Sequence, residues 1–137
     1  MPFDYAGREL AAHFDLMGEY RKLVVWQKAH ALAVDVDTLA KKIRGGAHAS
    51  LRNQMIRAAM SVPANIVEGR TQLSENDFCR FLNYALGSAR ELEYHLLIAK
   101  DIDAISEKEY WKLEGAISEV RKMLRGLIKK VRLPAIG

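Results

Sequence analysis

The sequence predicts an all-α protein folded as an antiparallel up-down-up-down four-helix bundle. Apolar residues recur at alternating steps of three and four along four segments, which is the spacing of one helix face. The connections between these segments are short, and short connections favour antiparallel packing of neighbouring helices. No segment alternates apolar and polar residues as a half-buried strand does.

Length and composition favour a single soluble domain. The chain has 137 residues, of which half are hydrophobic and three are prolines. Its one cysteine, Cys79, excludes an intramolecular disulfide and fits a reducing compartment. The N-terminus has no basic flank before an apolar core, and no apolar run approaches the ~18 residues of a membrane span. We therefore expect a cytoplasmic protein that makes no membrane contact.

The first predicted helix covers residues 25–43 and is followed by two glycines. Gly45 and Gly46 are expected to end it, since glycine accepts the left-handed conformation after a helix. Its apolar face consists of Val25, Ala29, Leu32, Val36, Leu39 and Ile43. Residues 1–22 lie outside the four-helix plan. We therefore divide the chain into an N-terminal extension, 1–22, and a bundle domain, 23–133.

The second predicted helix covers residues 50–69 and contains a proline. Pro63 cannot donate a hydrogen bond to the Ala59 carbonyl, and its ring crowds that carbonyl, so a kink is expected. Gly69 is the expected helix end. The apolar face consists of Leu51, Met55, Ala58, Val62 and Ile66.

The third and fourth predicted helices both begin with a serine N-cap and an acid three residues later. This spacing is typical of a capping box, and apolar residues flank each box as a hydrophobic staple would. The boxes pair Ser74 with Asp77 and Ser106 with Glu109, and the staples pair Leu73 with Phe78 and Ile105 with Tyr110. The apolar repeats then continue to residues 99 and 131.

Polar residues form a stripe on the second helix beside Pro63. The stripe consists of Asn53, Arg57, Ser61 and Asn65, with Glu68 nearby. A structural interpretation has these side chains satisfy backbone groups freed by Pro63, with Arg57 paired to Glu91 or Glu93 inside the bundle or at an interface. A functional interpretation makes the stripe a site for a ligand or a partner.

The last predicted helix carries the clearest electrostatic feature. Its basic residues are Arg121, Lys122, Arg125, Lys129, Lys130 and Arg132, which give +6 with no acid between them, whereas the rest of the chain is −2. Arg121, Arg125, Lys129 and Arg132 share one face. These cations either form a solvated surface that complements the helix dipole or bind a phosphate backbone.

The sequence offers no catalytic constellation. Di-iron bundles need Glu-x-x-His on two helices, whereas this chain has only Glu91 and His95, four residues apart. A glycine-rich phosphate loop is missing, and Cys79 stands outside any catalytic motif. We therefore expect a protein without catalytic residues, metal or cofactor.

Three stretches resemble a known family. They are LVVWQKAHALAVDV, LRNQMIRAAMSVPANIVEG and FCRFLNYALGSARELEYHLLIAKDI. They resemble the four-helix-bundle family of bacterial 23S ribosomal RNA intervening-sequence proteins, which includes the accessory variability determinant proteins of diversity-generating retroelements. The resemblance covers residues 20–131. It implies antiparallel bundles that assemble as ring-like homopentamers. It also implies that the retroelement members bind nucleic acid and a reverse transcriptase.

The resemblance assigns structural or interface positions but no catalytic role. The matching residues are Arg57, Pro63, Asn65, Glu68, Gly69, Gly87, Glu91 and Glu93. Surplus apolar residues on the second and third helices either thicken the core or, independently of the resemblance, favour an oligomer: Ile56, Met60, Val67, Phe81, Tyr84, Leu97 and Ile98. Glycines inside helices, Gly87, Gly115 and Gly126, predict close helix approach.

Together these features predict a non-catalytic homo-oligomer, a pentamer by resemblance, that binds nucleic acid through the basic face of its last helix. The same bundle is expected to act as an adaptor for a nucleic-acid enzyme such as a reverse transcriptase. The alternative is a protein–protein scaffold with no affinity for nucleic acid.

Overall fold

The computed structural model describes residues 20–132, and these form four long helices joined by short connections. The helices are α2 (Val24–Ala40), α3 (Ala49–Arg70), α4 (Glu75–Asp101) and α5 (Glu107–Arg132), with a 3-10 turn, η1 (Gly46–His48), before α3. Within residues 20–132 there is no strand. The predicted all-α class is therefore confirmed.

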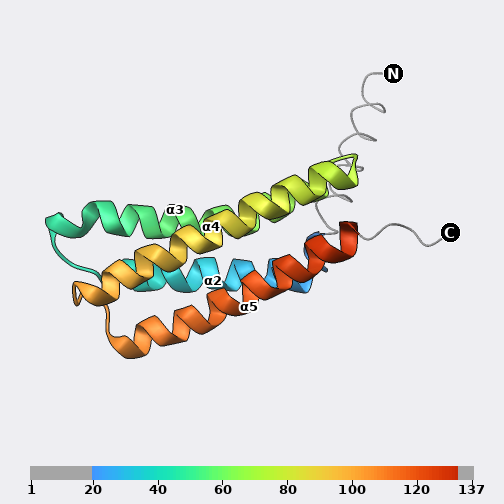
Figure 1. The fold of residues 1–137 in the computed structure, drawn as a ribbon. Helices are drawn as coiled ribbons and strands as arrows, with labels where there is room; N and C mark the ends of the chain where they lie inside the picture. Colours follow the sequence, from blue (N-terminus) through green and yellow to red (C-terminus); the bar gives the residue numbers. More distant parts are fainter. Residues whose placement is uncertain (1–19, 133–137) are drawn as a thin grey trace, which may run out of the picture.

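The four helices form one antiparallel bundle (Figure 1). α2 packs against α3 and α5, and α4 packs against the same two helices, so that the four surround a common core. The last turn of α5, the start of α2 and the α3–α4 connection lie at one end of the bundle. The predicted boundary at residue 23 stays a prediction, because residues 1–19 lie outside the described part of the chain.

The core consists of the apolar stripes that the sequence repeat predicts. Leu32, Met55, Leu92 and Ile117, one from each helix, are buried almost completely. Burial of a side chain of this size stabilises the folded state by about 1.5–3 kcal/mol. Of the residues predicted on these stripes, only Leu51, Leu127 and Val131 are half-buried rather than buried.

Both predicted serine caps are confirmed. The Ser74 Oγ accepts a hydrogen bond from the Asp77 amide at 3.1 Å, and α4 begins there. At the start of α5 the box is reciprocal: the Glu109 amide donates to Ser106 Oγ at 3.1 Å, and the Ser106 amide donates to Glu109 Oε1 at 2.9 Å. These bonds satisfy amides that a helix start leaves without intrahelical partners.

The two predicted staples have different outcomes. Ile105 and Tyr110 are both buried in the core, as a staple at α5 requires. The staple at α4 is wrong, because Leu73 is fully exposed. Phe78 packs on Gly69 of α3 instead, since a Cβ at Gly69 would lie 2.9 Å from Phe78 Cδ1. Gly69 therefore permits close contact of α3 with α4.

The prediction that Gly69 ends the second helix is wrong, because α3 continues to Arg70.

The first helix ends earlier than predicted. α2 stops at Ala40, and the amides of Lys42 and Ile43 donate to carbonyls only three residues back, at 3.0 and 3.1 Å. This tighter turn still buries Ile43 in the core. Gly45 has a φ of 98°, so the predicted left-handed conformation is confirmed, but it lies five residues after the helix end and does not itself end α2.

Candidate functional site

The basic residues of α5 are mostly exposed, and three of them border a groove against α4. The groove measures about 400 Å³ and is lined by Arg125, Ile128, Lys129 and Arg132 of α5 and by Asn83 and Leu86 of α4. Leu86 and Ile128 are buried and form an apolar floor. Within residues 20–132 the three cations form no ion pair. We call this site the basic groove.

Arg121 does not belong to the free basic surface, although the sequence places it on the same face. Its guanidinium pairs with the Glu93 carboxylate of α4, and both side chains are less than one-third exposed. Lys122 and Lys130 are exposed but lie outside the groove lining. The structure therefore brings together three of the six predicted cations and assigns a fourth to an interhelical ion pair.

Glu114 of α5 interacts with this ion pair. Burial raises the pKa of the Glu114 carboxyl above its ordinary value, and the negative charge of Glu93 raises it further. The Arg121 guanidinium acts in the opposite direction. Glu93 is the carboxylate that pairs with Arg121, and Glu114 lies close enough to both for their charges to act on its pKa. The sequence pattern contained no signal for this three-residue cluster.

The polar stripe beside Pro63 turns inward at its centre. The Asn65 side-chain amide donates to the Ser61 carbonyl at 2.8 Å and to Ser61 Oγ at 3.0 Å. Ser61 Oγ also hydrogen-bonds Ser88 Oγ of α4 at 2.8 Å. Pro63 itself is buried, and α3 runs through it without interruption. Ser61 and Asn65 therefore have structural partners, but none of these bonds reaches the Ala59 carbonyl that Pro63 frees.

The ion pair predicted from Arg57 to Glu91 or Glu93 is not formed within the chain. Glu93 pairs with Arg121, and Glu91 Oε1 lies 3.4 Å from His95 Nε2. Arg57 is exposed and has no ion pair among residues 20–132. The intramolecular form of that prediction is therefore wrong, because the two carboxylates have nearer partners on α5 and α4.

The interior glycines other than Gly69 do not mark close helix contacts. A Cβ at Gly87, Gly115 or Gly126 would meet no atom within 4 Å. All three are exposed, so the expectation of tight approach at these positions is wrong for the single chain.

A second groove between α2 and α3 is apolar. It measures about 430 Å³ and is lined by Trp26, His30, Ala33, Val34, Asp37, Met60, Pro63, Ala64 and Val67. Met60 is 58% exposed and Val34 is 53% exposed, which is unusual for large apolar side chains. Of the surplus apolar residues predicted on α3 and α4, Met60, Tyr84 and Leu97 are exposed and the others are half-buried. This second groove is called the apolar groove below.

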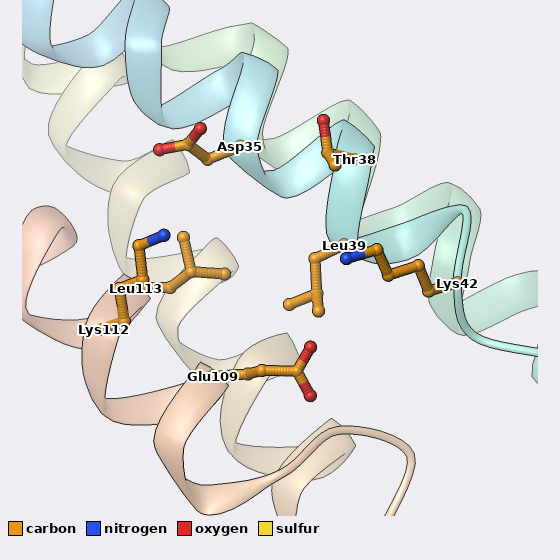
Figure 2. A pocket seen from close by; sticks show the side chains of 7 residues that line it. All are labelled: Asp35, Thr38, Leu39, Lys42, Glu109, Lys112 and Leu113. Carbon is orange, nitrogen blue, oxygen red and sulfur yellow. The ribbon is translucent and has the colours of Figure 1, made fainter.

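A small polar pocket between α2 and α5 contains charges of both signs. It measures about 140 Å³, and Figure 2 shows Asp35 and Lys42 facing Glu109 and Lys112 across it. Two of its polar side chains, Glu109 and Thr38, hydrogen-bond backbone groups of the bundle. The Glu109 carboxylate accepts the Ser106 amide, and the Thr38 hydroxyl donates to the Val34 carbonyl at 3.0 Å. This pocket offers no surplus charge for a ligand.

The described chain has neither a metal-binding cluster nor a membrane-spanning helix. Among residues 20–132, no three histidine, cysteine or acidic side chains are placed to hold a metal ion. No helix in the same part of the chain combines the length and apolar character needed to cross a bilayer. Cys79 is buried in the core.

The fold and its surface define a class of small helical bundle with a cationic groove. The family model of the 23S rRNA-intervening sequence protein matches residues 21–126, so the chain belongs to that family. A similar solved structure is a protein of unknown function from the S23 ribosomal protein family of Bacteroides thetaiotaomicron. It is 31% identical, covers 77% of this chain and 99% of its own, and superimposes with a TM-score of 0.73. No curated protein matches the chain.

Proposed function

We propose that this chain is a non-catalytic, homo-oligomeric bundle that binds nucleic acid, RNA or DNA, through the basic groove. The observation that carries the proposal is the convergence of Arg125, Lys129 and Arg132, without acidic partners in residues 20–132, around one cavity. Cations held together on a rigid helix favour a polyanion, because binding releases its condensed counterions. The Asn83 amide at the same groove already donates one hydrogen to the Cys79 carbonyl at 3.0 Å, and its second hydrogen is the donor available to a phosphate oxygen.

The test compares two variants of equal charge. One changes Arg125, Lys129 and Arg132 to glutamine, and the control makes the same change at Arg44, Lys108 and Lys112, which are exposed at the other end of the bundle. Fluorescence anisotropy with labelled structured RNA and duplex DNA should show a roughly ten- to hundred-fold loss of affinity for the first variant. The control should bind as wild type. Equal losses would mean that only net charge matters, and absence of binding by wild type would overturn the proposal.

The homo-oligomer is supported by the apolar groove. Exposed Val34 and Met60 lie on helices whose other faces already form the core. A second chain that covered them would remove apolar surface from water. In a ring of five, as the resemblance implies, the basic groove would repeat and give avidity. Light scattering after size exclusion measures the assembled mass directly, and a monomer at all concentrations would contradict this part of the proposal.

The adaptor role extends the proposal to a protein partner. The family resemblance supports a reverse transcriptase as that partner, and a cytoplasmic location follows from such a role. Co-purification of the chain with a reverse transcriptase encoded beside it would support this step. A copy of the gene inside a ribosomal RNA operon, with no such neighbour, would instead point to the intervening-sequence setting.

The alternative function is a protein–protein scaffold without affinity for nucleic acid. The apolar groove favours it, since most of the groove lining is apolar and Asp37 is its one acidic residue. In that case Met60→Glu would abolish partner binding or assembly, and the glutamine changes in the basic groove would have no effect.

A further inference from the structure

The outer face of α5 carries more than its cations. Residues at alternating steps of four and three form one line along the helix: Trp111, Gly115, Ser118, Lys122, Arg125, Lys129 and Arg132. All are exposed except Ser118, which is half-buried. We call this line the outer stripe. At 1.5 Å per residue it is roughly 32 Å long.

One end of the outer stripe is an exposed indole. Trp111 is 61% exposed, and its ring neighbours within residues 20–132 are the edge of the Tyr110 ring and the ammonium of Lys100. The ring centroids of Tyr110 and Trp111 are 5.1 Å apart at 73°, and Lys100 Nζ lies 5.9 Å from the indole centroid. An indole left open to water in this way offers a flat surface for stacking.

The middle of the outer stripe carries only small residues, Gly115 and Ser118. Gly115 has no side chain, and a Cβ placed there would meet nothing within 4 Å. Ser118 is small. Between Trp111 and Lys122 the outer stripe itself therefore carries no large side chain. The far end is the basic groove, where Arg125, Lys129 and Arg132 surround an apolar floor.

From this arrangement we propose that the outer stripe binds an unpaired nucleic-acid strand, with its phosphates on the cations and one base stacked on Trp111. This inference rests on the proposed function and specifies its ligand. A groove of cations with an aromatic platform is the combination that holds single strands, because every unpaired base presents a flat face. A duplex engages the cations equally well, but its bases are already stacked and only its ends offer a free face. Lys100 Nζ lies beside the indole but also 3.9 Å from Asp101 Oδ1, so the phosphates are assigned to the cations of the basic groove and not to Lys100.

The test measures affinity for a short oligothymidylate and for the same sequence as a duplex. Trp111→Leu should weaken single-strand binding by about ten-fold and leave duplex binding unchanged. Tyr84→Leu is the matched control, since Tyr84 is also an exposed aromatic, but it lies on α4, contacts Phe81 and does not line the basic groove. Circular dichroism checks that both variants fold.

A second readout does not depend on a variant at Trp111. In a Trp26→Phe protein, Trp111 is the only tryptophan, and its fluorescence should be quenched by the single strand but not by the duplex. Unchanged fluorescence at saturating single strand, or equal loss of both affinities in Trp111→Leu, would overturn the inference and leave the proposed function standing. Failure of wild type to bind either probe would overturn both.

Discussion

Arg121 of α5 is paired with Glu93 of α4, in a contact where both side chains are mostly shielded from solvent. The pair separates two groups of cations that the sequence presents as one. Arg121 joins two helices, whereas Arg125, Lys129 and Arg132 face the basic groove. Glu114 adds a second carboxylate to the pair.

Arg121→Gln should reduce stability with little effect on nucleic-acid binding. The change leaves the half-buried Glu93 carboxylate without its ion-pair partner and close to Glu114, and the expected loss in the free energy of unfolding is about 1–3 kcal/mol. Arg125→Gln should weaken nucleic-acid binding and leave stability almost unchanged, because Arg125 is exposed and has no ion pair in residues 20–132. Urea unfolding and anisotropy on both variants provide the comparison. A binding loss in Arg121→Gln as large as that in Arg125→Gln would contradict the assignment.

Glu114 should make the bundle less stable as the pH rises. Burial first, and Glu93 second, raise the pKa of Glu114 in the folded state. The folded protein therefore binds this proton more tightly than the unfolded chain does, and the stability associated with it is lost as pH increases through the raised pKa. Glu114→Gln removes the penalty, so its gain over wild type should be larger at about pH 7 than at about pH 4. A gain that does not change between these two pH values would contradict the proposed cause.

Glu109 should give a pH dependence of the opposite sign. The hydrogen bond from the Ser106 amide lowers the pKa of Glu109. Its contribution to stability is therefore present above the ordinary glutamate pKa and is lost as pH falls through the lowered one. Glu109→Gln should be less stable than wild type near neutral pH, and the two should converge in acid. Thermal unfolding across pH measures this, and a difference that persists in acid would show that the charge is not its cause.

Glycine-to-alanine changes should have opposite effects at two positions. Gly69→Ala places a Cβ 2.9 Å from Phe78 Cδ1 and 3.0 Å from Phe81 Cβ, so α3 and α4 must separate. The expected loss of stability is about 1–3 kcal/mol. Gly126→Ala meets open space and should stabilise the helix by about 1 kcal/mol. Chemical denaturation of both variants tests the pair, and a stabilised Gly69→Ala would show that the helices are not in close contact there.

The sequence was sufficient to predict the elements, because helix periodicity and capping are local. Four apolar repeats indicate the four helices, and Ser74 and Ser106 mark the starts of α4 and α5. Leu73 illustrates the limit of such patterns. The spacing of Leu73 and Phe78 fits a staple. Phe78 packs instead on α3 at Gly69, where the missing side chain leaves room for its ring, and Leu73 stays exposed. A choice between two apolar partners depends on tertiary packing and not on spacing.

The candidate site was predicted only in part, for the same reason. The basic run on α5 is visible in the sequence. Which of its cations pairs with Glu93 and which line the basic groove depends on the residues of α4 that lie opposite. Asn83 and Leu86 enter the groove from a segment about forty residues away in the sequence, and no local pattern links them to Arg132. The outer stripe was not predicted, although the spacing places Trp111 on the same helix face as the cations. An aromatic residue on a helix can be a core residue or an exposed stacking surface, and only the structure shows which.

The most direct test of the basic groove is the salt dependence of duplex DNA binding. We would measure anisotropy over a salt series for wild type and for the variant with Arg125, Lys129 and Arg132 changed to glutamine. The slope of log affinity against log salt should become shallower by about 0.9 for each phosphate that the variant no longer neutralises, or roughly three units in all. Equal slopes for the two proteins, or no binding by wild type at low salt, would make the basic groove a solvated surface. Protein partners at the exposed polar residues of α3, Arg57 and Glu68, would then be the next candidates.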